Sequence, residues 1–341
     1  MSTARSAVTL ADVAAAAGVD RSTASRALRG DTRRVNAGTI ERVRSAAAEL
    51  GYRPHLAAAT LRSGRSRMLG VLVPSITDAA MATLFAGIED EARAHGYLAV
   101  VTSTGSDDAV RRAAVETYRE RSVDGILVAD SLIGQASPAA GVPGGLPVVS
   151  VFRQGPPGQP SVVADEYAGG RIVAEHLLGL GHRDLVVVGD PDHVPTFRDR
   201  IAGFGDTVAA RLGDGAAPRV VRAGLQADDG HAAMRHVLAG PARPTAVFAT
   251  NDYSAVGAAH ALLEEGLVPG RDVALVGYND DPVAKHLPVP LTSVRLDVEA
   301  LGRRGARALI EALAGRPVDV DVQVPHLVVR ASSQVTVAPP R

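Results

Sequence analysis

From residue 68 onward, short apolar runs alternate with longer amphipathic segments, and no other feature of the sequence restricts the fold as strongly. The apolar runs are too short to be helices and are rich in valine, which is typical of buried strands. Strands that alternate with helices along a chain predict a parallel sheet with helices on both faces. The first series contains the runs MLGVLVP, YLAVVTS, DGILVAD and PVVSV, with predicted helices at 79–95 and 108–121.

A second series follows two stretches rich in proline and glycine, GQASPAAGVPGGLP and RQGPPGQPS, which predict surface loops. After it, the C-terminal segment predicts one more helix and two strands. Two successive series of similar size predict two lobes with a cleft between them. The second series has predicted helices at 167–180, 197–212, 227–239 and 252–265, and predicted strands at 184–189, 218–222, 244–249 and 272–277.

The N-terminal part of the chain has a helical pattern instead. Thr9 and Asp12 have the spacing of a capping box at the start of a helix, and Gly18 is placed to end that helix. Asp20 can cap a second helix and Asn36 a third. This part of the chain therefore predicts two short helices joined by a tight turn, followed by a third helix.

The second of these helices has one face of arginines and serines, opposite a face of small apolar residues. Arginine side chains match the O6 and N7 acceptors of guanine in the major groove, and hydroxyl groups reach phosphates. This face is therefore suited to a DNA-recognition helix, although a helical hairpin with a solvated charged face is the plainer alternative. Its polar residues are Arg21, Ser22, Ser25 and Arg26.

The charge of the chain is divided unevenly. The first 67 residues contain 12 arginines and 5 acidic residues, whereas the remaining 274 contain 24 basic and 32 acidic residues. A basic N-terminal part on an acidic body indicates a polyanion as the partner of the N-terminal part alone.

Several classes of site are excluded or disfavoured. The chain has no cysteine, which excludes disulfides, thiolate metal sites and cysteine nucleophiles. His231 and His236 are five residues apart and do not share a helix face, so they are poor metal ligands. We find no H-E-x-x-H, G-x-S-x-G, phosphate-loop lysine or G-x-G-x-x-G motif. We therefore expect no catalytic residue, no metal and no cofactor.

The chain also lacks the sequence features of export. No apolar run approaches the length that spans a membrane, and the N-terminus MSTARSAVTL has no apolar signal core. We expect a cytoplasmic, nucleoid-associated protein with no membrane partner.

Polar residues directly follow four of the predicted strands. In open α/β sheets, ligands bind beyond the carboxyl ends of the strands. An arginine, amides and carboxylates that converge on one cleft suit a polyhydroxylated ligand, although each residue alone would be an ordinary turn or cap. The four clusters are Ser75 to Asp78, the loop 190–196 with Arg198 and Arg200, Asn251-Asp252, and Tyr278-Asn279-Asp280.

Motifs along nearly the whole chain resemble the lactose/galactose repressor (LacI/GalR) family. Near the N-terminus these are V-T-L-x-D-V-A-x-x-A-G-V, a second helix ending S-R-x-L, T-x-x-R-V, G-Y-x-P and L-R. In the body they are R-D-R-I-A-G-F, T-N-D and V-G-Y-N-D, with P-L-T-S-V after them. The resemblance implies an all-α helix-turn-helix headpiece and an α/β effector domain, like the periplasmic binding proteins, made of two doubly wound parallel-sheet lobes.

The resemblance also implies domain boundaries. They are a headpiece at 1–53, a hinge helix and linker at 54–67, a first lobe at 68–164 with 296–324, and a second lobe at 165–295 with 325–341.

By position, the resemblance implies a set of DNA contacts. Arg21, Ser22 and Arg26 would read base edges. Leu61, with Ala58 beside it, would enter the minor groove at the operator centre, where apolar wedges of this kind bend DNA. The phosphate contacts would be Thr9, Ser25, Asn36 and Thr39.

The resemblance implies ligand contacts as well. Phe152 stands where the family commonly has aspartate, which removes a hydroxyl acceptor and supplies an aromatic face, so the ligand need not be a typical hexose. The other implied ligand residues are Ser75, Arg200, Asn251, Asn279 and Asp280.

The sequence thus favours a DNA-binding transcription regulator, most simply a repressor, controlled by a small ligand such as a sugar or related polyol. A homodimer on a palindromic operator is expected, because one small headpiece reads too few bases. The alternatives are a solute-binding protein and an α/β enzyme. DNA binding would separate the regulator from both, and turnover of a ligand would identify the enzyme.

Overall fold

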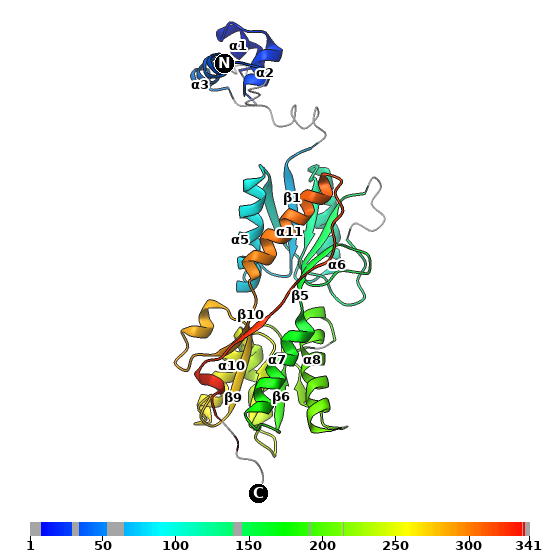
Figure 1. Cartoon of the computed structure of the whole chain (residues 1–341), viewed down its shortest axis with the longest axis vertical. Helices are drawn as coiled ribbons and strands as arrows, with labels where there is room; N and C mark the ends of the chain where they lie inside the picture. Colours follow the sequence, from blue (N-terminus) through cyan, green and yellow to red (C-terminus); the bar gives the residue numbers. More distant parts are fainter. Residues whose placement is uncertain are drawn as a thin grey trace, which may run out of the picture. The chain divides into compact units, whose positions relative to one another are not determined.

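The computed structural model describes residues 8–28, 34–52, 65–138, 145–190, 192–213, 215–335 and 337. Backbone contacts divide the chain into two units, Met1–Ser66 and Arg67–Arg341. We refer to the first as the headpiece and to the second as the body (Figure 1).

The described part of the headpiece is helical. Small apolar side chains fill the space between its helices, because three short helices enclose only a small core. The helices are α1 (Leu10–Ala16), α2 (Arg21–Leu28) and α3 (Ala37–Glu49). The buried residues are Val13, Ala14, Ala24, Ala27, Val35, Ile40, Val43, Ala46 and Ala47.

The predicted caps define the helix ends of the headpiece. Thr9 and Asp12 form the capping box of α1. Gly18, with a φ of 64°, occupies the left-handed conformation in the turn that follows. Asn36 caps α3 by accepting a hydrogen bond from the backbone N–H of Thr39. The predicted arrangement of three helices is confirmed.

The first lobe of the body contains a six-stranded sheet whose described pairings are all parallel, in the order β11-β5-β4-β3-β1-β2. Helices α5 and α11 pack together on one face and α6 on the other. The strands are β1 (Met68–Val73), β2 (Leu98–Ser103), β3 (Gly125–Val128), β4 (Val148–Phe152), β5 (Ser161–Ala164) and β11 (Asp321–Gln323). The helices are α5 (Ala79–Ala94), α6 (Asp108–Glu120) and α11 (Val298–Leu313).

The second lobe repeats this plan in the order β12-β10-β9-β8-β6-β7, with only the β10–β12 pair antiparallel among the described pairings. Helices α7 and α8 pack together, as do α9 and α10. The strands are β6 (Leu185–Val188), β7 (Arg219–Val221), β8 (Ala246–Ala249), β9 (Ala274–Asn279), β10 (Thr292–Arg295) and β12 (His326–Val328). The helices are α7 (Glu166–Gly179), α8 (Pro195–Leu212), α9 (Ala227–Leu238) and α10 (Asp252–Glu264), with 3-10 turns η1 (Pro282–Lys285) and η2 (Ala331–Ser333).

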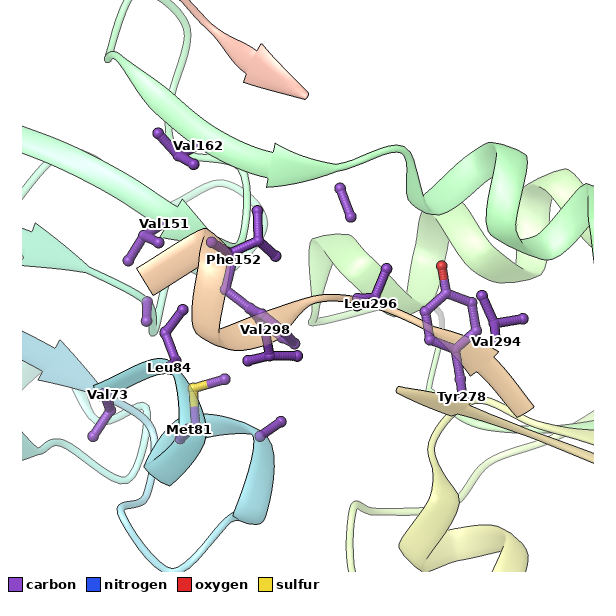
Figure 2. Packing of buried hydrophobic residues seen from close by; sticks show 14 of the residues in the cluster. Val73, Met81, Leu84, Val151, Phe152, Val162, Tyr278, Val294, Leu296 and Val298 are labelled. Atoms are coloured by element: carbon purple, nitrogen blue, oxygen red, sulfur yellow. The ribbon is translucent and has the colours of Figure 1, made fainter. Parts of the chain in front are cut away.

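The chain passes between the two lobes three times: after β5, after β10 and between β11 and β12 (Figure 1). Along the second passage, Val294, Leu296 and Val298 are buried in one apolar cluster that includes side chains of both lobes. Figure 2 shows Leu296 and Val298 between Tyr278 of the second lobe and Phe152 of the first, with Val294 beside Tyr278. The passage is therefore part of the core.

The predicted fold class is confirmed, and the predicted helices of the body agree with the observed ones to within two residues at each end. Two details were wrong. Strand β5 was not predicted, because its four residues follow a proline- and glycine-rich stretch and are too few to show periodicity. The C-terminal segment forms three strands, β10, β11 and β12, where two were predicted.

No helix within the described ranges is long and apolar enough to cross a membrane.

Candidate functional site

Helix α2 presents its polar residues as the sequence predicts. Arg21 and Ser22 are exposed at its N-terminus, and Ser25 and Arg26 are half-buried one turn later. Asp20 caps the helix by accepting hydrogen bonds from the backbone N–H groups of Ser22, at 2.8 Å, and Thr23, at 2.9 Å. Hydrogen bonds from Thr23 and Ser22 hold the pKa of the Asp20 carboxyl far below its usual value. The cap therefore keeps the N-terminus of α2 in place when the solution is acidic.

Three of the four residues expected to contact phosphates, Thr9, Asn36 and Thr39, lie at helix N-termini, whereas Ser25 lies within α2. Thr9 precedes α1, and its hydroxyl donates to Asp12 at 2.8 Å. Asn36 precedes α3 and bonds to the backbone of Thr39, whose side chain is buried. Helix N-termini attract phosphate through their free N–H groups and dipole. The expected hinge contacts Ala58 and Leu61 lie outside the described residues.

A small cavity lies between the two lobes of the body. It has a volume of about 20 Å³, which is room for about one water molecule. The first lobe contributes Thr77, Asp78 and Ala79, all beyond the end of β1. The second lobe contributes Leu225, Gln226, Asn251, Tyr253, Asn279 and Asp281.

Two of the predicted ligand residues, Asn251 and Asn279, line this cavity. Asn251 also caps α10, accepting from the backbone of Ser254 at 2.8 Å and donating to its hydroxyl at 3.0 Å. Asn279 has a φ of 102°, which is rare for a residue with a side chain. Such backbone strain occurs most often at functional sites.

Arg200 is fully buried behind Asn279 rather than open to the cavity. Its guanidinium binds both carboxylate oxygens of Glu166, at 2.8 and 3.0 Å, and the carbonyl of Thr250 at 2.6 Å. It lies 3.5 Å from the side-chain oxygen of Asn279 and stacks on Tyr278 with 3.6 Å to the ring centre. Arg200 therefore holds α7, α8, β8 and β9 together.

The other three predicted ligand residues have neighbours within the protein. Ser75 is half-buried, and its hydroxyl lies 2.7 Å from that of Thr77 in the cavity wall. Phe152 is buried in the apolar core, pointing toward Val298 (Figure 2). The Asp280 carboxylate is bound by two guanidinium groups, those of Arg295 and Arg330, each with one contact of 2.6 Å.

The cavity is lined by two carboxylates, one from each lobe, that were not among the predicted ligand residues. Asp78 comes from the first lobe and Asp281 from the second. Asp281 is 8% exposed. Its burial and the charge of Asp78 raise its pKa to about 6. The only sequence signal was the position of each aspartate beyond a strand end.

Arg153, which follows Phe152 at the end of β4, was also missed. It is 4% exposed, and its Nε and Nη1 atoms make no hydrogen bond to any residue that the structure describes. Burial lowers its pKa to about 10, while Asp130 and Asp78 act in the opposite direction. Asp130 likewise has one buried carboxylate oxygen, Oδ1, without a described partner, although Oδ2 binds Thr104 and Arg111. Buried donors and acceptors of this kind are normally satisfied, so this pair suits a bound polar molecule.

The raised pKa of Asp281 predicts a pH-dependent stability. In the unfolded chain an aspartate ionises near pH 4, whereas Asp281 in the folded protein ionises at about pH 6. The free energy of unfolding therefore falls as the pH rises from about 4 to 6, and above about pH 6 the loss is complete. Asp281→Asn removes this loss. We expect it to raise the unfolding free energy of the body by up to about 3 kcal/mol at pH 8, and by less than about 1 kcal/mol at pH 4. Urea unfolding at both pH values measures the difference, with the exposed Asp319→Asn as control; an equal gain at both would contradict the prediction.

Two family descriptions match the sequence. The model described as "Bacterial regulatory proteins, lacI family" matches residues 9–55, and "Periplasmic binding protein-like domain" matches residues 174–333. The chain is 30% identical to the HTH-type transcriptional regulator PtxS of Pseudomonas plecoglossicida over 98% of both chains. It is 33% identical to the HTH-type transcriptional regulator CelR of Thermobifida fusca, over 95% of this chain and 98% of CelR.

Solved structures agree over the full length. A Lac repressor dimer bound to operator and the anti-inducer ONPF has a TM-score of 0.85 and 27% identity, covering 96% of this chain and 99% of the repressor. A complex of the transcriptional regulator CelR with cellobiose has a TM-score of 0.72 and 29% identity, covering 96% of this chain and all of that one.

Proposed function

Because this chain belongs to the lacI family of bacterial regulatory proteins, we propose that it is a transcriptional repressor controlled by a sugar or related polyol bound between the lobes of its body. The observation that carries the proposal is that one chain contains both a candidate DNA-binding surface and a candidate ligand site. Helix α2 presents exposed arginine and hydroxyl groups. The body holds a buried arginine, Arg153, that has unused hydrogen-bond donors and interacts electrostatically with Asp78 in the wall of the inter-lobe cavity. The first feature suits DNA and the second suits a small polar ligand.

The proposed DNA contacts rest on the resemblance to the lacI family and, in α2, on the exposure of the side chains. Arg21 and Ser22 at the exposed start of α2 read base edges in the major groove, and Arg26 follows one turn later. Ser25, Thr9, Asn36 and Thr39 contact phosphates, and Ala58 and Leu61 act in the hinge. One three-helix headpiece reads too few bases for a specific site, so a homodimer binds a palindromic operator. The Lac repressor structure, described as a dimer bound to operator, supports this arrangement.

The charged side chains of the body indicate which class of ligand is favoured. Arg153, whose charge acts on Asp78, has no ion-pair partner among the described residues, and Asp78 and Asp281 have no guanidinium partner there. A ligand with many hydroxyl groups can donate to the carboxylates and accept from Arg153 at once. A neutral polyol therefore fits better than an acid, whose negative charge would face both aspartates.

The proposed mechanism is a shift between two arrangements of the lobes. The cavity has room for about one water molecule, so the lobes must part to admit a sugar and then close on it. A ligand bound by Asp78 of the first lobe and by Asp281 and Asn279 of the second favours that closed arrangement. The three passages between the lobes must adjust to closure, and the buried side chains of Leu296 and Val298 tie that adjustment to the core of the first lobe. Residues 54–67 lead directly into the first strand of the first lobe, so closure alters how the two hinge segments of a dimer are presented to DNA. The ligand changes operator affinity only as far as it prefers one arrangement.

Two substitutions in α2 test the DNA half of the proposal. Arg21→Ala is expected to lower affinity for the preferred operator by about 1–3 kcal/mol and to relax base preference at one position. Ser25→Ala is expected to weaken binding to all sequences equally, because a phosphate contact carries no base information. Selection from a random DNA pool, followed by binding measurements at fixed salt on preferred and scrambled duplexes, separates the two. An equal loss of specificity in both variants would reject the assignment.

The proposal also specifies what the protein does not do. Regulation by binding alone, in the cytoplasm, requires no turnover of the ligand. Incubation of the purified protein with each ligand that binds, followed by chromatography of the small molecules, tests this; a chemically changed ligand would favour the enzyme alternative.

A further inference from the structure

Outside the cleft, helices α9 and α10 bring together three side chains that bind transition metals in other proteins. His231 comes from α9, and His260 and Glu264 come from α10. One ligand atom from each can be chosen so that all three lie within 4.8 Å of one another. His231 Nε2 is 2.8 Å from Glu264 Oε2, and His260 Nε2 is 3.7 Å from Glu264 Oε1.

The backbone around this cluster is tightly held. A side chain at Gly257 would overlap with the carbonyl oxygen of Ala227, and one at Gly230 would overlap with that of Ser254. The two helices thus make backbone contact within one turn of His231 and His260. Ligands on packed helices are held more reproducibly than ligands on loops.

We propose that His231, His260 and Glu264 form a binding site for a divalent transition-metal ion of the zinc type. Two imidazoles and one carboxylate are a donor set that zinc accepts, and they leave a fourth position for water. Imidazole donors disfavour calcium and magnesium, which prefer oxygen. Metal–ligand distances of about 2 Å require the three donor atoms to lie about 3–3.5 Å apart. The donors lie within 4.8 Å of one another, so metal binding requires a side-chain movement, most simply of His260, which is exposed.

The electrostatics of the site include one competing cation. Arg235, one turn after His231 on α9, places its Nη1 atom 3.8 Å from Glu264 Oε2. The metal must displace or tolerate this guanidinium, which competes for the same carboxylate. Removing Arg235 should therefore tighten metal binding at this cluster, whereas it should not affect adventitious binding elsewhere on the surface.

The experiment uses the full-length chain without a polyhistidine tag, treated with a chelator and then titrated with Zn²⁺ by calorimetry. Because the chain has no cysteine, thiolates give no background. Co²⁺ is added in parallel, since its visible absorption reports tetrahedral coordination. We expect one high-affinity equivalent in the wild type, and at least about 100-fold weaker binding in His260→Ala and His231→Ala, because even outer-sphere partners contribute about 10–100-fold.

His236→Ala is the matched control, since His236 is an exposed histidine of α9 outside the cluster. It should bind like the wild type, and Arg235→Ala should bind more tightly. Circular dichroism and thermal unfolding of each variant without metal establish that the fold is intact. Absence of stoichiometric binding in the wild type would overturn the proposal, as would unchanged binding in both His260→Ala and His231→Ala.

Discussion

Arg200→Ala is expected to destabilise the second lobe by about 3–5 kcal/mol, because it leaves the buried Glu166 carboxylate without its partner. Arg200 also bonds to the carbonyl of Thr250 and stacks on Tyr278, so α7, α8, β8 and β9 all lose a shared contact. One buried guanidinium thus connects all four of these elements. Urea unfolding, followed by circular dichroism, measures the loss.

The control for this prediction is Arg198→Ala. Arg198 is exposed on the same helix and pairs only with its neighbour Asp199 among the described residues, so its removal should cost less than about 0.5 kcal/mol. Adding Glu166→Gln to Arg200→Ala should recover part of the stability, because the remaining buried group is then uncharged. If Arg200→Ala unfolds within about 1 kcal/mol of the wild type, the buried pair is not the support that the geometry indicates.

This expectation determines how the ligand site should be tested. A loss of ligand response in Arg200→Ala would not distinguish a missing ligand contact from a disordered lobe. The informative position is one whose side chain is buried, interacts electrostatically with a residue of the cavity wall and leaves hydrogen-bond donors unused.

Arg153→Met is that test, and it should weaken the ligand response while the unliganded protein stays at least as stable as the wild type. Methionine has a similar length and no charge, so it removes a buried guanidinium whose Nε and Nη1 have no described partner. Hydrogen bonds to a charged group contribute about 1.5–3 kcal/mol, so ligand affinity should fall by about 10- to 100-fold.

The measurement is a thermal-shift screen of the wild type and Arg153→Met against neutral sugars, sugar alcohols, sugar acids and nucleosides. A ligand that binds the native state raises the melting temperature by mass action. Neutral polyols should give the largest shifts and sugar acids smaller ones, because Asp78 and Asp281 repel an acid. Arg198→Met serves as the control for removal of an exposed arginine. An equal shift in wild type and Arg153→Met would exclude Arg153 as a ligand contact, and preferential binding of acids would overturn the assigned ligand class.

Local sequence patterns were sufficient for the headpiece and for most elements of the body. The capping box of Thr9 and Asp12 and the cap at Asn36 act over three residues, so the sequence alone specifies them. Helix and strand periods are equally local, which is why the predicted helices match the observed ones closely. Strand β5 escaped prediction because its four residues become a strand only by pairing with β4 and β11.

The candidate sites depend on contacts between distant parts of the chain, and here the sequence indicated regions rather than roles. It placed Arg200 and Asp280 near strand ends, but it could not show that Glu166, 34 residues earlier, binds Arg200, or that Arg295 and Arg330 bind Asp280. It set aside His231 because His236 lies on another face of the same helix. The partners of His231 are His260 and Glu264, on a helix that packs against its own.

Local patterns along the chain specify which segments become helices and strands and which strand ends carry polar groups. Which of those polar groups are satisfied by the protein, and which remain available, depends on contacts that form only when the chain folds. Hydrogen bonds and ion pairs act over about 3–4 Å in space, whatever the separation along the chain. Arg200 and Arg153 therefore look alike in the sequence and differ in the fold, where one is bound on several sides and the other is not.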